Sequence, residues 1–473
     1  MSKIVGMRGY LASSIGVSCT AALALSFALP AAAAGPRTPG PGSAPVRGVS
    51  SSDGPDRAAV PGSTRSLALG PLTPDRAAGG APEEGLAPRT VPSFSLVGVV
   101  WDDPGTELHG HVQIRTRLRA TNRWSAWQEV ENDHHGHGPD PGTAEGRSHR
   151  MRGATAPLWV GDSDGVEVRV RAEAEQPGGT RVPALPDGLR VELVDPGTAV
   201  GAPGQAGRPA SPQGPDEGVP GVGSIEAAVD AGLAPLKRPV LPALPATADV
   251  LKEVPAGRAD EAPGRRRAGA ESYTAPRPRI VTRSGWGADE NLRESGFVYT
   301  GGLKAAFVHH TATGNNYTCA QAPSVIRSIY RYHVVSSGWR DIGYNFLIDK
   351  CGNIYEGRAG GVDKPVMGAH TLGFNSDTTG IAVLGTYTGT APSAAAVDAV
   401  AAVSAWKLGL YGVDPRGRTY LQSAGGNLYP KGENARLNVI SGHRDGFATE
   451  CPGKLLYDRL GSVRSTAARL QGR

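Results

Sequence analysis

The chain has 473 residues, a formal net charge of +5 at pH 7, 66 glycines and 39 prolines. This length exceeds that of one compact domain, and the glycine and proline content indicates long linkers or turns. A hydrophobic content of 39% excludes a polytopic membrane protein. Basic residues form no tract interleaved with aromatic residues, so no nucleic acid partner is expected.

Residues 1–34 have the composition of an export signal peptide. Positive charges at Lys3 and Arg8 precede an apolar stretch over residues 15–29, and small residues close the segment at Ala34. A membrane anchor is the alternative, but the apolar run is short and ends in small residues. We therefore expect a secreted protein with no stable membrane anchor.

Changes in composition divide the next part of the chain into three segments. Residues 35–91 are rich in proline, glycine and alanine without an apolar period, which predicts disorder. Residues 92–198 contain apolar residues at period two, interrupted by glycine, proline and aspartate. This pattern predicts a small all-β accessory domain resembling a β-sandwich. Residues 199–274 are again rich in proline and glycine and predict a flexible linker.

Residues 275–473 alternate between strand and helix patterns. Short apolar runs predict strands at residues 305–309, 344–348, 380–384 and 439–441. Val325, Ile329 and Tyr332 mark one face of a predicted helix that ends before Gly338. Further helices are predicted at residues 393–410, with Ser393 as the expected N-cap, and at residues 455–470. This alternation predicts an α/β domain with a mixed β-sheet flanked by helices.

Histidines and one cysteine are the candidates for chemistry in this α/β domain. His309, His310, His370 and His443 lie near predicted strand ends, and Cys451 follows eight residues after His443. Two histidines and one cysteine would leave one open position on a tetrahedral zinc ion, as in a catalytic site. From spacing alone, the alternative is a set of core histidines with a buried thiol.

Three cysteines remain once the signal peptide is removed, namely Cys319, Cys351 and Cys451. An odd number in an exported protein predicts one disulfide and one thiolate that is kept for another purpose. The absence of a Cys-x-x-Cys pair argues against a structural zinc knuckle.

A second histidine cluster, formed by His134, His135 and His137, lies in the predicted all-β domain. Such a cluster could bind a metal ion. Because aspartate, glycine and proline surround it between predicted strands, we interpret it as a solvated loop.

Eight sequence blocks between about residues 278 and 465 occur in the order of one known family. They are residues 283–288, 308–312, 338–346, 355–358, 368–375, 380–383, 442–445 and 449–453. This order resembles the peptidoglycan recognition protein family, which is similar to bacteriophage-type N-acetylmuramoyl-L-alanine amidases. The resemblance covers about two-fifths of the chain. The preceding β-region resembles, with less specificity, that of secreted actinobacterial amidases.

The resemblance implies a zinc cofactor held by His309, His443 and Cys451. It selects His309 rather than His310, and strand alternation agrees because successive side chains point to opposite faces. His310 is then expected to be a hydrogen-bonded core histidine. Family members that bind peptidoglycan without cutting it usually lack the cysteine, so Cys451 favours catalysis.

Further residues acquire expected roles from the same resemblance. Tyr344 would lie beside the metal and, with Thr449, stabilise the oxyanion of the reaction. A core tyrosine is the alternative for Tyr344. His370, Asn375 and Arg358 would line the substrate groove, where Arg358 suits the carboxylates of a peptide. Structural roles for Arg358 and Asn375 remain open.

The family often carries a disulfide near the start of the first helix of this domain, and here Cys319 and Cys351 are the implied pair. Cys319 opens that helix, and Cys351 follows the strand that starts at Tyr344. The cross-link would stabilise the fold by about 3–4 kcal/mol in the loop-entropy account.

We therefore expect a secreted, cell-wall-associated, zinc-dependent N-acetylmuramoyl-L-alanine amidase that acts as a monomer on peptidoglycan and its muropeptides. It would cleave the amide between N-acetylmuramic acid and the L-alanine of the stem peptide. One alternative is a non-catalytic peptidoglycan-binding recognition protein. Another is a zinc peptidase that cuts within the stem peptide, and a third is a wall-targeting role for the all-β domain.

Overall fold

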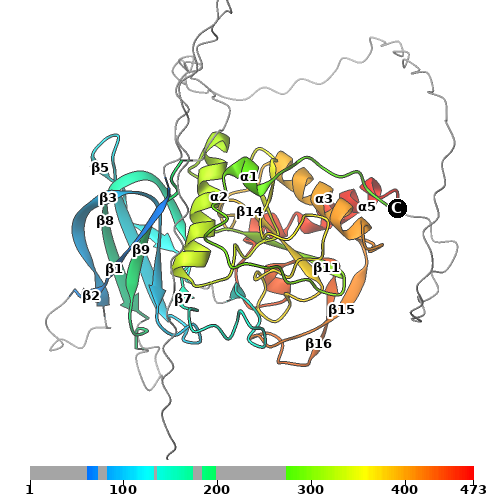
Figure 1. Ribbon diagram of the computed structural model, residues 1–473, viewed down its shortest axis with the longest axis horizontal. Helices are drawn as coiled ribbons and strands as arrows, with labels where there is room; N and C mark the ends of the chain where they lie inside the picture. Colours follow the sequence, from blue (N-terminus) through cyan, green and yellow to red (C-terminus); the bar gives the residue numbers. More distant parts are fainter. Residues whose placement is uncertain (1–60, 73–82, 133–135, 174–183, 199–272) are drawn as a thin grey trace, which may run out of the picture. The chain divides into compact units, whose positions relative to one another are not determined.

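The computed structural model describes residues 61–72, 83–132, 136–173, 184–198 and 273–473 (Figure 1). By its contacts the chain divides into Met1–Pro55 and Asp56–Arg473, and all described residues belong to the second unit. The predicted signal peptide and residues 199–272 of the predicted linker lie outside the described residues. Among the helices that the structure describes, none is long and apolar enough to cross a membrane.

The predicted all-β domain is present, and its described strands form one antiparallel sheet. The strand order is β1-β9-β3-β8-β4-β5, with β2 and β7 paired to β3 and β6 paired to β4. The long strands β3 and β8 carry register shifts, which let them bend. The strands are β1 (Ser63–Ala68), β2 (Gly70–Pro71), β3 (Glu83–Trp101), β4 (Gly110–Leu118), β5 (Arg123–Trp124), β6 (Gln128–Val130), β7 (Gly153–Ala154), β8 (Leu158–Ala172) and β9 (Arg190–Asp195).

Alternating valines and isoleucines build the core of this sheet. Val112 and Ile114 of β4 stand opposite Val170 and Val168 of β8, and all four are fully buried. Cross-strand pairs of β-branched residues stabilise a sheet, which explains why the period-two pattern predicted these strands correctly.

The predicted disorder of residues 35–91 is wrong where the structure describes that segment. Strands β1 and β2 and the first half of β3 lie within it. Strand β1 is an edge strand that pairs with β9 through its backbone, for example Leu67 opposite Val191. Most of its side chains are exposed or half-buried, so it carries no apolar alternation that could have revealed it.

The α/β domain contains the mixed sheet that the sequence predicted, with the order β10-β13-β12-β14-β11-β17. Strand β11 runs parallel to both β14 and β17, whereas β12 and β13 are antiparallel. A separate antiparallel pair, β15 and β16, follows the second long helix. The strands are β10 (Ile280–Val281), β11 (Ala305–His310), β12 (Phe346–Ile348), β13 (Ile354–Glu356), β14 (Thr378–Val383), β15 (Arg418–Gln422), β16 (Asn434–Asn438) and β17 (Ile440–Gly442).

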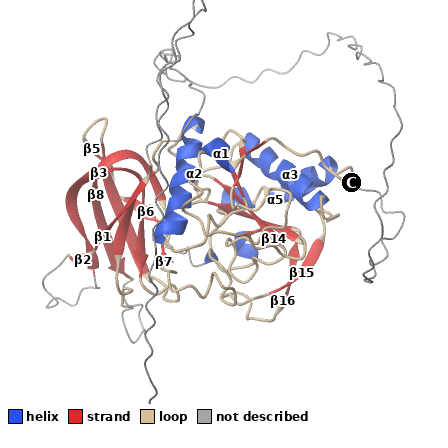
Figure 2. Ribbon diagram, in the orientation of Figure 1, coloured by secondary structure: helices blue, strands red, loops and turns tan. Residues whose placement is uncertain are grey.

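Helices cover both faces of this sheet (Figure 2). On one face, Leu347 of β12 belongs to the same core as Ile329 of α2. On the other face, Phe346 and Ile348 pack in a core with α3 and α5. Ser393 caps α3 as predicted, since its side chain accepts from the Ala396 N–H. The helices are α1 (Arg283–Trp286), α2 (Ala322–Arg331), α3 (Ala394–Gly409), α4 (Lys454–Tyr457) and α5 (Leu460–Leu470).

The structure joins Cys319 to Cys351, which confirms the expected disulfide. Their Cα atoms are 6.2 Å apart, and 32 positions separate them in the sequence. The cross-link ties the turn before α2 to the turn after β12. Cys451 is outside this disulfide and is buried.

The all-β domain shares a hydrophobic core with helix α2. Leu96, Val100 and Val194 of the all-β domain belong to one buried cluster with Ile329 and Tyr332. The Tyr332 hydroxyl also donates to the Thr155 carbonyl at 3.1 Å. The two domains are therefore packed together through apolar side chains as well as polar contacts.

Candidate metal centre

Two neighbouring parallel strands and one loop carry the three expected zinc ligands. His309 lies in β11, and His443 directly follows β17. Val308 stands opposite Gly442 in this parallel pairing, so the two histidines leave the sheet side by side. Cys451 lies in the loop that precedes α4. Strand pairing thus brings the two histidines together, and the loop before α4 brings Cys451 to them.

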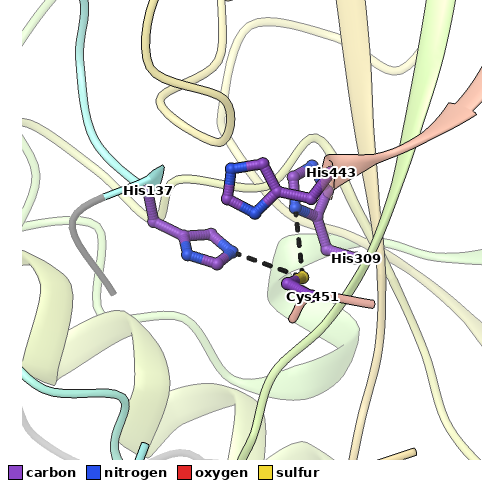
Figure 3. Close-up of side chains that lie close together, drawn as sticks. All are labelled: His137, His309, His443 and Cys451. Carbon is purple, nitrogen blue, oxygen red and sulfur yellow. Dashed lines mark hydrogen bonds between the residues drawn. The ribbon is translucent and has the colours of Figure 1, made fainter. Parts of the chain in front are cut away.

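The three side chains converge in the fold, as Figure 3 shows. The His309 and His443 rings are 4.6 Å apart between centroids, and Cys451 Sγ is 3.8 Å from His309 Nδ1. All three residues are buried. A tetrahedral zinc ion would hold its sulfur and nitrogen ligands about 3.5 Å apart, so the spacing suits such an ion.

A fourth donor, His137, comes from the all-β domain (Figure 3). Its Nε2 is 3.9 Å from Cys451 Sγ, and its ring is 4.3 Å from the His443 ring. One ligand atom from each of His137, His309, His443 and Cys451 lies within 4.8 Å of the others. The prediction that His137 belongs to a solvated loop is therefore wrong.

The local histidine-rich sequence around His137 was the only signal for this donor. Aspartate, glycine and proline around it are typical of exposed loops, but here the loop lies against another domain. His134 and His135 lie outside the described residues. Packing between distant parts of the chain, rather than local composition, decided the environment of His137.

Hydrogen bonds orient the imidazole rings of the cluster. His309 Nε2 lies 3.2 Å from His370 Nδ1, which leaves His309 Nδ1 facing the sulfur. His443 Nε2 lies 2.9 Å from the carbonyl oxygen of Gly136. If Nε2 carries the proton in each donor, Nδ1 presents its lone pair, and such outer partners commonly fix metal-binding histidines.

The Cys451 sulfur also receives a backbone hydrogen bond. The His310 N–H donates to Sγ at 3.4 Å. Thr449 shapes the same loop, since its hydroxyl accepts from the Cys451 N–H at 3.1 Å. A donor directed at sulfur favours the thiolate, which is the form that binds zinc.

His310 points away from this cluster, as strand alternation predicted. Its Nδ1 accepts from the Tyr387 N–H at 3.4 Å. Its Nε2 lies 3.2 Å from a Glu131 carboxylate oxygen of the all-β domain. His310 is thus a buried, hydrogen-bonded residue, with one partner that the sequence did not anticipate.

His370 lies behind His309 instead of lining an open groove. It is completely buried, and its Nδ1 also lies 3.0 Å from the Thr371 hydroxyl. Burial, with a smaller effect of nearby His443, lowers the pKa of His370 well below its ordinary value. A neutral His370 can therefore hold the His309 ring through its nitrogen.

Tyr344 lies next to the cluster, near both His309 and His137. Their ring centroids are 5.6 Å apart, and the His137 ring is 5.8 Å from Tyr344. Burial raises the pKa of Tyr344 well above its ordinary value. The phenol therefore keeps its proton at neutral pH and is a potential hydrogen-bond donor.

The two other expected substrate residues contact acidic side chains of the all-β domain. Arg358 forms a fork with Glu145, with both N···O distances at 2.9 Å. Asn375 donates to Asp140 through Nδ2 at 2.7 Å. Burial raises the pKa of Asp140, although its hydrogen bonds act in the opposite direction. These contacts could not be inferred from either segment alone.

Comparisons with known proteins match both domains to described families. The domain family described as N-acetylmuramoyl-L-alanine amidase matches residues 300–454. The family described as Rv3811 N-terminal galactose-binding domain-like matches residues 55–187. The chain thus combines an amidase-class α/β domain with an accessory all-β domain.

Individual relatives of the α/β domain are peptidoglycan-recognition proteins and amidases. Peptidoglycan-recognition protein SC2 of Drosophila simulans is 33% identical over 182 residues, which are 38% of this chain and 84% of that protein. The Homo sapiens N-acetylmuramoyl-L-alanine amidase is 34% identical over 190 residues, 39% of this chain and 28% of that protein. The solved structure of Drosophila PGRP-LB aligns with 26% identity and a TM-score of 0.31, over 39% of this chain and 93% of that one. The chain belongs to the peptidoglycan recognition protein family.

Proposed function

We propose that the protein is a secreted zinc-dependent N-acetylmuramoyl-L-alanine amidase. It hydrolyses the amide between N-acetylmuramic acid and the L-alanine of the peptidoglycan stem peptide. The observation that carries the proposal is the convergence of buried Cys451 with His309 and His443 at one sheet edge. Relatives named as amidases and as peptidoglycan-recognition proteins support the substrate class.

The donor set fits zinc. Imidazole nitrogen and thiolate sulfur are its usual protein ligands, and the His310 N–H directed at Cys451 Sγ favours the thiolate. His309, His443 and Cys451 would hold the ion. When bound, zinc supplies the Lewis acidity that activates water and polarises an amide carbonyl.

The remaining site residues of the chain then act around the scissile amide. The neutral Tyr344 phenol holds a proton that can be donated to the oxyanion of the tetrahedral state. Thr449 keeps the Cys451 loop in place and is the second proposed oxyanion partner. His370 orients His309, while Arg358 and Asn375 bind polar groups of the stem peptide.

The proposal also includes export of the protein and a separate role for each segment of the chain. An export signal over residues 1–34 would bring the chain to its peptidoglycan substrate outside the membrane. Residues 275–473 would carry the chemistry, and residues 199–274 would be a linker. A recognition protein that binds peptidoglycan without cutting it is the alternative, because several family relatives are named for recognition.

Mass spectrometry of digested peptidoglycan tests the proposed reaction. The full chain, with zinc and with a chelator, is compared with the Cys451→Ala variant. We expect free stem peptides that begin at L-alanine, lost on chelation, restored by zinc and absent for Cys451→Ala. Muropeptides that bind the protein but stay intact under every condition would favour the recognition alternative. Cleavage within the stem peptide would instead identify a peptidase.

A further inference from the structure

A loop of the all-β domain lies against the candidate metal centre. This loop, residues 136–147, lies between β6 and β7 and is named the docking loop here. His137 Nε2 is 3.9 Å from Cys451 Sγ, and His309 Nδ1 is 3.8 Å from the same sulfur. The His443 ring is 4.3 Å from His137 and 4.6 Å from His309. His137 thus lies as close to Cys451 and His443 as the expected zinc ligand His309 does.

Zinc chemistry gives a fourth donor a specific consequence. A catalytic zinc site has three protein ligands and keeps its fourth position for water or substrate. A site with four protein ligands is closed, and it resembles a structural zinc site. His137 is therefore positioned to occupy the place that the reacting water needs.

The docking loop also engages the residues expected to bind the stem peptide. Glu145 meets the guanidinium of Arg358 in a fork, and the side chains are only 7% and 5% exposed. Asp140 accepts from Asn375 Nδ2 at 2.7 Å and from the Gly373 N–H at 2.8 Å. Two carboxylates of the all-β domain thus occupy polar groups that would recognise carboxylates or amides of a peptide.

Backbone contacts seat the docking loop closely on the α/β domain. The Gly136 carbonyl accepts from the Leu372 N–H at 2.8 Å and from His443 Nε2 at 2.9 Å. A Cβ atom at Gly136 would lie 2.7 Å from a Phe447 ring carbon and 2.8 Å from His443 Nε2. Only glycine permits this approach without displacement of the ligand His443. The loop is therefore fitted to the metal centre at backbone level.

We infer that His137 is a fourth ligand of the metal centre. The docking loop occupies the residues that would bind the stem peptide. The full chain is therefore a latent amidase. This inference rests on the proposed function. Activity then requires the docking loop to leave the groove. A peptide that bears carboxylates competes with the docking loop for Arg358 and Asn375, because the carboxylates of Glu145 and Asp140 already bind these two side chains.

Cobalt substitution tests the fourth ligand without reference to activity. The full chain is loaded with Co²⁺, and its visible absorption is recorded with and without azide as a small added ligand. We expect the wild-type spectrum to stay unchanged when azide is added. The spectrum of His137→Ala should change, because loss of the imidazole opens a coordination position on the Co²⁺ ion. His149→Ala removes an exposed histidine two residues beyond the docking loop and should behave as wild type. Equal azide responses for wild type and His137→Ala would overturn the inference.

Ligand binding tests the docking loop as a substitute for substrate. The probe is a synthetic N-acetylmuramyl tripeptide with a free terminal carboxylate, and affinity is measured by calorimetry on Co²⁺-loaded full chain. Glu145→Gln keeps the shape of the side chain but removes its charge. We expect Glu145→Gln to bind the probe about tenfold more tightly than wild type, or more, since the fraction of molecules with an open groove rises. Glu129→Gln, at an exposed position of β6, is the matched control. Unchanged affinity for Glu145→Gln would contradict substrate imitation.

Kinetics separate a failure of this inference from a failure of the proposed function. With purified peptidoglycan, we expect His137→Ala to release stem peptides with a kcat about tenfold or more above wild type. If neither protein releases stem peptides, the amidase proposal fails, and the cobalt spectra still decide whether His137 binds metal. If wild type and His137→Ala release stem peptides at equal rates and give equal Co²⁺ spectra, the inference of a latent form is wrong, whereas the amidase proposal is supported.

Discussion

Glu145 and Arg358 form a buried ion pair although 213 positions separate them in the sequence. The carboxylate belongs to the all-β domain, and the guanidinium belongs to the α/β domain. A buried pair is costly to break because the remaining charge loses its partner in a dry environment. This single contact therefore links domain packing to Arg358, the residue proposed to bind the stem peptide.

A double-mutant cycle measures the coupling in this pair. We expect Glu145→Gln alone to lower the free energy of unfolding by about 3–5 kcal/mol, because buried Arg358 keeps its charge. The double variant Glu145→Gln with Arg358→Met should lose less than the two single variants combined, since no unpaired charge remains. Urea unfolding of all four proteins gives the coupling energy. Strictly additive losses would show that the pair contributes no specific stability.

His370 should tune metal affinity without being a ligand. It holds His309 Nε2 at 3.2 Å, and outer partners of this kind typically contribute about 10–100-fold to metal affinity. We expect His370→Ala to weaken zinc binding by that factor in a competition assay with a chromogenic chelator. His310→Ala, which removes the neighbouring histidine that faces away, should change zinc affinity much less. Equal losses for the two variants would contradict a specific role for His370.

The disulfide should stabilise the fold without affecting the metal centre. Replacing both Cys319 and Cys351 by serine removes a cross-link across 32 positions, so the free energy of unfolding should fall by about 3–4 kcal/mol. The Co²⁺ spectrum should stay the same because Cys451 is unaltered. Non-reducing mass spectrometry of tryptic peptides identifies the pair directly. Both thiols found free in the oxidised protein would refute the pairing.

Lys407 should make stability depend on pH in the alkaline range. Its ammonium is buried and donates to the carbonyls of Val362 and Lys364, and burial lowers the pKa of Lys407 to about 8. Between this value and the ordinary value of about 10.4, the unfolded chain binds more protons, so stability rises with pH. From pH 7.5 to 9.5 we expect a gain of about 2 kcal/mol in the free energy of unfolding.

Variants at two lysines check this assignment. Lys407→Met should abolish the gain between pH 7.5 and 9.5, whereas Lys454→Met changes an exposed lysine and should preserve it. Urea unfolding at several pH values provides the measurement. A wild-type protein whose stability is flat or falls over this range would show that buried Lys407 keeps an ordinary pKa.

Local pattern was sufficient for much of the α/β domain. Period-two runs and the Ser393 cap predicted strands and helices that the structure contains, because side-chain direction repeats regularly within an element. One part of that prediction differs, since the last helix is divided into α4 and α5. The family resemblance also selected His309, His443 and Cys451, whose side chains the structure brings close together.

Only the tertiary structure decided what lies opposite those residues. His137, Asp140 and Glu145 come from a loop whose composition is typical of solvent-exposed segments, and nothing in their neighbours encodes a partner in another domain. Their contacts depend on the shared core of β3 and α2, which is made of residues far apart in the sequence. Strand β1 escaped prediction for a related reason, because an edge strand is held by backbone pairing that has no side-chain signature. Periodicity reports which face of an element is buried, but not which distant segment buries it.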